Sequence, residues 1–176
     1  MAEYEFTLRF RLADPEQDPR ELEDALFDAG CDDATLGVGQ RGRLALAFVR
    51  NARTARGAMS SAIQAVRKAS PGALLVEASP DLVGLTDIAA LVGCSRQNMR
   101  KLMLHHAATF PAPVHDGSTA LWRLASVLEW LCNVQGQAID KTLLELARET
   151  RSLNLAREVS ALGKTGLPRT WTTLVA

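Results

Sequence analysis

Hydrophobic and polar residues alternate along the first dozen positions of the chain. Tyr4, Phe6, Leu8, Phe10 and Leu12 are apolar, and mainly polar residues stand between them. A period of two places the apolar side chains on one face of an extended strand. The pattern therefore predicts a β-strand with one buried face at the start of the chain.

Helical spacing replaces this alternation in two later segments. Asp18-Pro19 opens a stretch whose small and apolar residues recur every three or four positions up to Gly30, where a helix can end. A second stretch of this kind begins at Ala55 and stops at Ser70-Pro71-Gly72. Each segment is predicted to form an amphipathic helix.

Three shorter segments complete the first eighty residues. Residues 34–38 and 43–50 have the character of strands joined around Gly39-Gln40-Arg41-Gly42, and residues 73–78 alternate weakly as a fourth strand. With right-handed crossovers, the order βαββαβ closes into a four-stranded antiparallel sheet with both helices on one face. We expect an α+β protein with a ferredoxin-like domain over residues 1–80.

The other face of this predicted sheet offers polar and small side chains. The first strand presents Glu5, Thr7, Arg9 and Arg11 there, and the third strand contributes alanines. RNA-recognition domains of the same plan stack bases on aromatic residues of the open face, which this pattern lacks. The face fits pairing of two subunits, docking of a partner protein or binding of a small ligand, and the sequence does not choose among these.

The middle of the chain has the pattern of a helix-turn-helix. Between Leu85 and Ser95 we predict a short helix capped by Thr86, a turn at Gly93 and a second helix capped by Ser95. Packing between the two helices leaves one face of the second helix toward solvent, and that face carries Arg96, Gln97, Arg100 and Lys101. Such side chains can read bases in the major groove of DNA without a cofactor.

A hairpin and a closing helix are predicted after the helix-turn-helix. Phe110–Arg123 contains a stiff proline-rich entry, a strand, an Asp116-Gly117 turn and a returning strand, which together make a wing. A short apolar helix over residues 127–131 then completes a small domain of residues 84–132.

The segment from Leu85 to Leu131 resembles the MerR-like winged helix-turn-helix of the AlpA regulators, phage excisionases and related small DNA-binding proteins. The resemblance covers 47 of 176 residues and rests on Leu85-Thr86-x-Ile88-Ala89, Gly93-x-Ser95-Arg96, Phe110-Pro111-x-Pro113, Trp122-Arg123 and Val127-Leu128-x-Trp130-Leu131. One departure is a longer stretch from Leu104 to Thr109, which favours a longer second helix.

The resemblance implies a set of DNA-binding residues. It places the basic face of the second helix in the major groove and the wing on the DNA backbone or in the minor groove. The implied set is Thr86, Ser95, Arg96, Gln97, Arg100, Lys101, His115, Ser118 and Arg123.

The segment from residue 136 to residue 176 is predicted to be a helical segment followed by a tail. Apolar residues recur at helical spacing between Ile139 and Leu162, which predicts either one helix or two helices divided at Ser152-Leu153-Asn154, with a stop at Gly163. The apolar stripe fits packing on the same chain or against a second subunit. We favour a homodimer, which would present two recognition helices to repeated half-sites.

Composition and charge place this chain among ordinary globular proteins. Its 176 residues are 47% hydrophobic and 23% charged, and 20 Lys and Arg cancel 20 Asp and Glu. Any attraction to DNA must therefore come from local patches. The charge is unevenly distributed: residues 1–33 hold 11 acids and 3 bases, and residues 34–80 hold 7 bases and 1 acid. The acidic N-terminus and the lack of a long apolar run favour a cytoplasmic protein with no membrane contact.

The sequence contains no complete motif for catalysis, metal binding or cofactor binding. Cys31, Cys94 and Cys132 form no CxxC pair and are expected to be buried. Residues 37–42 match a dinucleotide-binding fingerprint, but a strand follows where a helix is needed. Residues 163–165 resemble the end of a phosphate-binding loop, but Glu158 occupies the required glycine position. The histidines lack a nucleophile with an orienting acid, so we expect no enzyme activity and no cofactor.

The leading expectation is a sequence-specific, double-stranded DNA-binding transcriptional regulator of bacterial or phage type, with an antitoxin-type autoregulator as one form. The first alternative is an architectural DNA-binding protein of the excisionase or phage terminase small-subunit type. A second alternative is an adaptor whose winged domain binds protein.

Overall fold

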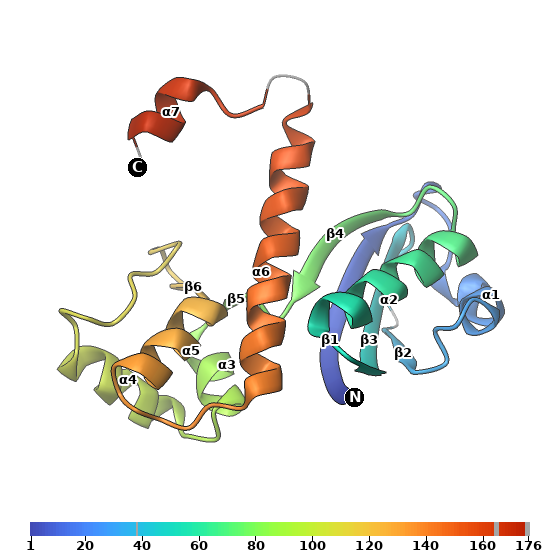
Figure 1. Ribbon diagram of the computed structural model, residues 1–176. Helices are drawn as coiled ribbons and strands as arrows, with labels where there is room; N and C mark the ends of the chain where they lie inside the picture. The colour runs from blue at the N-terminus through green and yellow to red at the C-terminus, as the bar shows by residue number, and fades with distance from the viewer. Residues whose placement is uncertain (38, 164–165, 175–176) are drawn as a thin grey trace.

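The computed structural model of the chain describes residues 1–37, 39–163 and 166–174. Within these residues the fold is mixed α+β, with a four-stranded antiparallel sheet, a two-stranded sheet and seven α-helices. The larger sheet lies at one end of the molecule, three short helices lie at the other end, and one long helix stands between them (Figure 1).

The strands of the larger sheet agree with the predicted segments. They are β1 (Ala2–Arg11), β2 (Ala34–Gly37), β3 (Arg43–Ala52) and β4 (Leu74–Ser79). Neighbouring strands are antiparallel in the order β2-β3-β1-β4. Val38, the predicted last residue of the second strand, lies outside the described residues.

Two helical segments connect these strands, as predicted. The first is a 3-10 turn, η1 (Pro19–Leu22), that continues into α1 (Glu23–Asp28), and the second is α2 (Ala55–Ala69). The carboxylate of Asp18 accepts a hydrogen bond from the backbone N–H of Arg20 at 3.0 Å and so caps the first turn.

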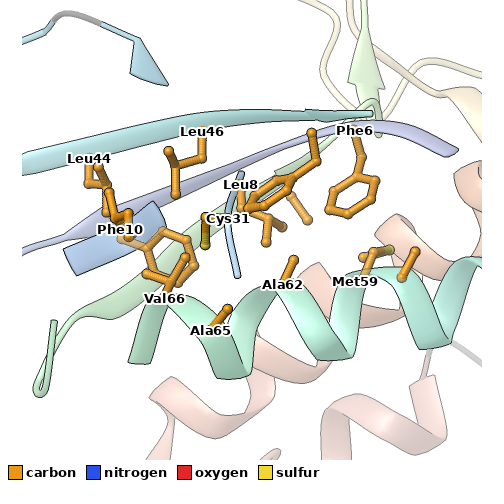
Figure 2. Packing of buried hydrophobic residues seen from close by; sticks show 14 of the residues in the cluster. Phe6, Leu8, Phe10, Cys31, Leu44, Leu46, Met59, Ala62, Ala65 and Val66 are labelled. Carbon is orange, nitrogen blue, oxygen red and sulfur yellow. The ribbon is translucent and has the colours of Figure 1, made fainter. Parts of the chain in front are cut away.

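The core of this part lies between the sheet and the helices (Figure 2). Because apolar residues alternate along β1 and β3, Leu8, Phe10 and Leu46 point toward α2. There they pack against Val66 and small alanines of that helix. Alanine lets helix and sheet approach closely, and each large buried side chain contributes about 1.5–3 kcal/mol relative to exposure. Periodicity of the sequence is thus sufficient to place this core.

A second hydrophobic core is formed by the middle of the chain. Its elements are β5 (Leu82–Val83), α3 (Leu85–Leu91), α4 (Arg96–His105), β6 (Trp122–Arg123) and α5 (Leu124–Asn133). Ile88, Met99 and Leu128 are fully buried in it. The predicted closing helix over 127–131 is therefore part of a ten-residue helix.

The long helix α6 (Lys141–Ala161) contacts both cores, and it is a single helix with no division at residues 152–154, the first of the two predicted alternatives. Leu146 belongs to the first core and Ala147 to the second. A helix end follows near Gly163, as predicted, and a last helix, α7 (Arg169–Leu174), lies beyond it.

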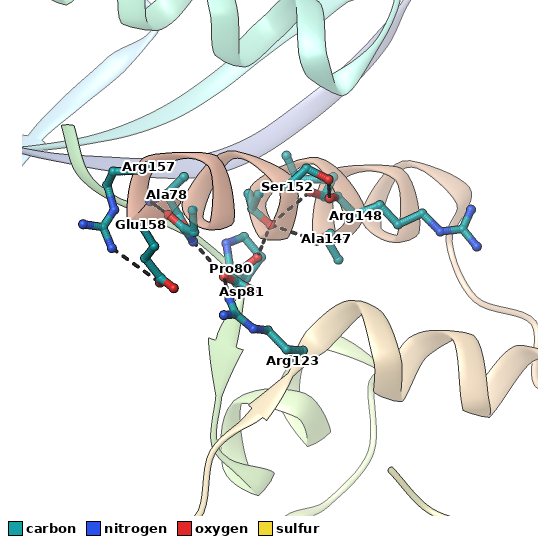
Figure 3. A network of polar contacts seen from close by, with 12 residues as sticks. Ala78, Pro80, Asp81, Arg123, Ala147, Arg148, Ser152, Arg157 and Glu158 are labelled. Atoms are coloured by element: carbon teal, nitrogen blue, oxygen red, sulfur yellow. Dashed lines mark hydrogen bonds and ion pairs between the residues drawn. The ribbon is translucent and has the colours of Figure 1, made fainter. Parts of the chain in front are cut away.

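A buried polar network explains why α6 continues through Asn154 (Figure 3). Its side-chain amide donates to the carbonyl oxygen of Ala78 at 2.8 Å and accepts from the N–H of Ala78 at 2.9 Å. The same amide donates to Asp81 at 2.8 Å, and the Thr150 hydroxyl donates to the Pro80 carbonyl oxygen at 2.6 Å. The two bonds to Ala78 satisfy backbone groups at the outer edge of β4, which would otherwise lack partners.

The sheet face that was predicted to be open lies partly opposite α3 and the start of α6. Glu5, Thr7 and Ala47 line a groove of about 630 Å³ whose other wall includes Leu91 of α3 and the first turn of α6. Leu91 is 39% exposed because it faces this groove.

Candidate nucleic-acid interface

The turn between α3 and α4 is fixed by local hydrogen bonds. Gly93 adopts a φ of +72°, and the N–H of Cys94 donates to the carbonyl oxygen of Ala89 at 2.8 Å. Glycine takes this left-handed conformation without the steric cost that a Cβ would add. The turn predicted at Gly93 is confirmed.

The cap of α3 differs from the predicted one. Gly84, not Thr86, is the N-cap residue, and its N–H donates to the carboxylate of Asp87 at 3.0 Å. Thr86 lies in the first helical turn and is exposed. The prediction of a Thr86 cap is wrong. Gly84 stands three positions before Asp87, so the Asp87 carboxylate can accept a hydrogen bond from the Gly84 N–H and fix the start of the helix there.

Helix α4 begins where it was predicted to begin. Ser95 is its N-cap, and the Ser95 hydroxyl oxygen accepts from the N–H of Asn98 at 3.1 Å. Met99 is buried against α3, which fixes the rotation of α4 about its axis. The helix ends at His105, so the longer second helix favoured by the sequence does not form.

One face of α4 is exposed and basic. The four side chains predicted to enter the major groove are all exposed: Arg96, Gln97, Arg100 and Lys101. None of them forms a side-chain hydrogen bond or an ion pair within the part of the chain that the structure describes. The helix contains no acidic residue. Its donors are therefore available to an external ligand.

Asn98 is an addition to this surface that the sequence reasoning missed. It is exposed in the first turn of α4, where only its backbone N–H is used by the cap. Asparagine can form two hydrogen bonds with adenine in the major groove. Its position inside the predicted recognition helix could have identified Asn98 from the sequence.

The segment between α4 and β6 does not form the predicted two-stranded wing, because residues 110–114 form no strand and only one β-bridge closes the loop. His115 and Leu121 make an isolated β-bridge, with the N–H of Leu121 donating to the carbonyl oxygen of His115 at 2.9 Å. The returning strand β6 pairs with β5 and not with residues 110–114. His115 and Ser118 are exposed on this loop.

Aromatic contacts hold the base of the loop against α5. Phe110 meets the rings of Trp122 and Trp130 edge to face, at centroid distances of 6.3 and 5.0 Å. The indole N–H of Trp122 donates to the carbonyl oxygen of Pro111 at 3.0 Å. The loop and α4 both lie at the end of the molecule farthest from the four-stranded sheet (Figure 1).

Arg123 lies inside the protein and not on the wing surface. Its guanidinium donates to the carboxylate of Asp81, and the Arg123 and Asp81 side chains are 13% and 1% exposed. Because Asp81 also accepts from Asn154, Arg123 belongs to the network that joins β5, β6 and α6. We therefore leave Arg123 out of the candidate interface.

The three cysteines differ in their exposure. Cys31 is buried as expected, Cys94 is half-buried, and Cys132 is exposed, which corrects the prediction for that residue. Burial raises the pKa of the Cys31 thiol. No group of three or more metal-ligating side chains occurs among residues 1–37, 39–163 and 166–174. No helix in these ranges is long and apolar enough to cross a membrane.

Comparisons with protein-family models, with curated proteins and with solved structures found no match to this chain.

Proposed function

We propose that this protein is a sequence-specific, double-stranded DNA-binding transcriptional regulator that places α4 in the major groove. One observation carries the proposal. Arg96, Gln97, Arg100 and Lys101 are exposed together on a helix whose other face is packed into a core, and they have no partner within the described residues. An α-helix fits the major groove, where Arg and Lys donate to guanine and Gln pairs with adenine.

The proposed fold assignment follows from the same region. We propose that residues 84–132 are a winged helix-turn-helix of the MerR-like AlpA or excisionase type, with the loop around His115 as a short wing. The capped α4, the Gly93 turn and the His115–Leu121 bridge support this assignment. For residues 1–80, the strand order β2-β3-β1-β4 and the shared core with both helices support a ferredoxin-like domain.

Local charge supports DNA binding although the whole chain is neutral. Helix α4 carries three basic side chains and no acid, so its field is positive near the proposed groove contact. No catalytic step, metal or cofactor enters this proposal, since binding alone accounts for the exposed donors.

We also propose that the protein works as a homodimer. Leu155 and Val159 on the C-terminal half of α6 and Leu162 at its C-cap are exposed at spacings of four and three residues, and Trp171 on α7 is 60% exposed. Apolar residues at this spacing form a stripe along one side of a helix. Two copies paired through the stripe would offer two α4 helices to repeated half-sites.

The test is to select bound fragments from the source genome and then measure their affinity by fluorescence anisotropy. We expect Arg100→Ala to weaken a selected duplex by about 1–3 kcal/mol and to relax base preference at one position. Arg53→Ala is the matched control, because Arg53 is exposed and distant in sequence from α4. Equal affinities of wild-type and Arg100→Ala proteins would remove Arg100 from the interface.

Two further outcomes separate the alternatives. Fragments confined to one promoter support a regulator, whereas fragments from attachment or packaging sites that bend strongly on binding support an architectural protein. If no fragment is selected even at low salt, where phosphate contacts are strongest, the DNA-binding proposal is wrong.

A further inference from the structure

Arginines gather around one groove between the four-stranded sheet and α6. The groove has a volume of about 960 Å³, and no acidic residue is among those that line it. Its five arginines come from β1, β3, α2 and α6: Arg9, Arg11, Arg43, Arg67 and Arg157. We call this surface the basic groove.

Most of the charge in the basic groove is uncompensated. Arg9 pairs with Glu77 at 3.1 Å and Arg157 with Glu158 at 3.5 Å. Arg11, Arg43 and Arg67 form no ion pair within the described residues.

The strand register adds a second observation about two of these residues. Arg11 and Arg43 stand directly opposite each other in the pairing of β1 with β3. Like charges at opposed positions destabilise a sheet, and an anion that binds both removes that cost. A single copy of the chain supplies no such anion within the described residues.

The floor of the basic groove is partly apolar. Leu74 and Val76 of β4 line the groove and are exposed, and Leu153 and Ala156 of α6 line it as well. Arginine beside exposed apolar surface is the composition typical of protein–protein contacts. The phosphates that line the outside of duplex DNA offer no apolar group for Leu74 and Val76.

A complementary surface exists on α1. Glu23, Asp24 and Asp28 are exposed around Phe27, whose side chain is 66% exposed. We call these four residues the acidic helix face. An exposed aromatic side chain surrounded by three carboxylates is complementary to a groove that is both apolar and positively charged.

The two surfaces do not meet within one copy. None of the six ion pairs in the described part of the chain joins the acidic helix face to the basic groove. Helix α1 lies at the end of the N-terminal half that is remote from α6, and α6 forms one wall of the groove (Figure 1).

We propose that the acidic helix face of one copy binds in the basic groove of a second copy. Carboxylates of α1 pair with Arg11, Arg43 and Arg67, and Phe27 covers Leu74 and Val76. The contact joins two different surfaces, so a bound pair leaves one acidic helix face and one basic groove free, and further copies add head-to-tail. It uses neither α4 nor the loop around His115, so it is independent of DNA binding.

Sedimentation velocity of the full chain without DNA tests this contact. At about 0.05 M salt we expect assemblies larger than the proposed dimer that grow with protein concentration. At about 1 M salt, where charges are screened beyond about 3 Å, we expect them to dissociate. A sedimentation coefficient that is independent of concentration and salt would overturn the proposal.

Charge reversal identifies the surfaces. The first variant carries Asp24→Lys and Asp28→Lys, and the second carries Arg11→Glu and Arg43→Glu. In each variant the two surfaces have the same sign, so association at low salt should fall at least about tenfold. An equimolar mixture contains two matched contacts and should assemble again in alternation. This recovery also excludes misfolding as the cause of the loss.

A charge-matched control excludes an effect of net charge, which matters because the chain is neutral at pH 7. Arg96→Glu with Arg100→Glu lowers the net charge by the same amount as Arg11→Glu with Arg43→Glu, but on α4, and should assemble like wild type. The proposal fails if this control loses assembly, if either reversed variant still assembles alone, or if the mixture does not. A wild type that stays unassembled, with DNA affinity lost on Arg11→Glu and Arg43→Glu, would assign the groove to DNA.

Discussion

Replacing Arg123 by methionine would remove the cation that faces Asp81, the one buried carboxylate among the described residues. The methionine side chain keeps most of the length of the arginine stem and removes the charge and the hydrogen bond. We expect the protein to lose stability because Asp81 would remain buried without a counter-ion.

The structure sets the size of this loss. Breaking a buried ion pair by removing one partner costs about 3–5 kcal/mol, since the remaining charge stays desolvated. Asp81 would keep the hydrogen bond from Asn154 at 2.8 Å, which favours the lower end, about 3 kcal/mol. For a chain of this length the loss corresponds to a fall in Tm of about 6–12 °C.

Urea denaturation of matched variants measures the effect. Arg148→Met is the control, because Arg148 pairs with Glu129 at 2.7 Å but the two side chains are 55% and 35% exposed, so we expect about 0–1 kcal/mol. Adding Asp81→Asn to Arg123→Met removes the unpaired charge and should recover about half of the loss or more. A cost below about 1 kcal/mol, or no recovery in the double variant, would refute the reasoning.

Three further predictions concern single positions. Tyr4, the only tyrosine, donates to Glu145 at 2.7 Å, and this hydrogen bond raises the pKa of the phenol above its ordinary value. Absorbance titration should show it ionising at higher pH than in Glu145→Ala, and the linked stability, present below about pH 10, is lost as pH rises through the folded pKa. Asp140 caps α6, and a hydrogen bond from Thr142 lowers its pKa. Asp140→Ala should cost about 0.5–2 kcal/mol at neutral pH by chemical denaturation. That difference should shrink as pH falls below about 4, because protonation removes the charged cap; a constant difference would contradict this. Gly93→Ala should destabilise the protein by about 1–2 kcal/mol in thermal unfolding, because Gly93 has a φ of +72°, and a gain in stability would count against a strained turn.

Local features of the sequence were enough to predict most elements. The alternation along β1, the helical spacing of α2, the Ser95 cap and the Gly93 turn each depend on a few neighbouring residues. The exposed basic face of α4 could also be predicted, because burial of Met99 fixes which side of the helix remains outside. The prediction of a Thr86 cap was wrong because Thr86 and Asp87 both have side chains that can cap a helix, and it is the Asp87 carboxylate that accepts the hydrogen bond from the Gly84 N–H.

Features decided by distant residues could not be predicted in this way. The sequence predicted Arg123 as a wing residue, but the fold brings it beside Asp81, which is 42 positions away in the chain. Asn154 looked like a helix break, yet its amide binds the edge of β4 at Ala78, 76 positions away.

The sequence by itself determined the strands of the N-terminal sheet, the turn between α3 and α4 and the side chains that α4 presents, because periodicity, caps and turns act over one or two helical turns. Only the tertiary structure decided that α6 remains a single helix between two cores, that Arg123 is internal, and that the arginines of four separate elements line one groove. Those features depend on which polar groups meet after folding, and burial forces such groups to find partners wherever the chain brings them together.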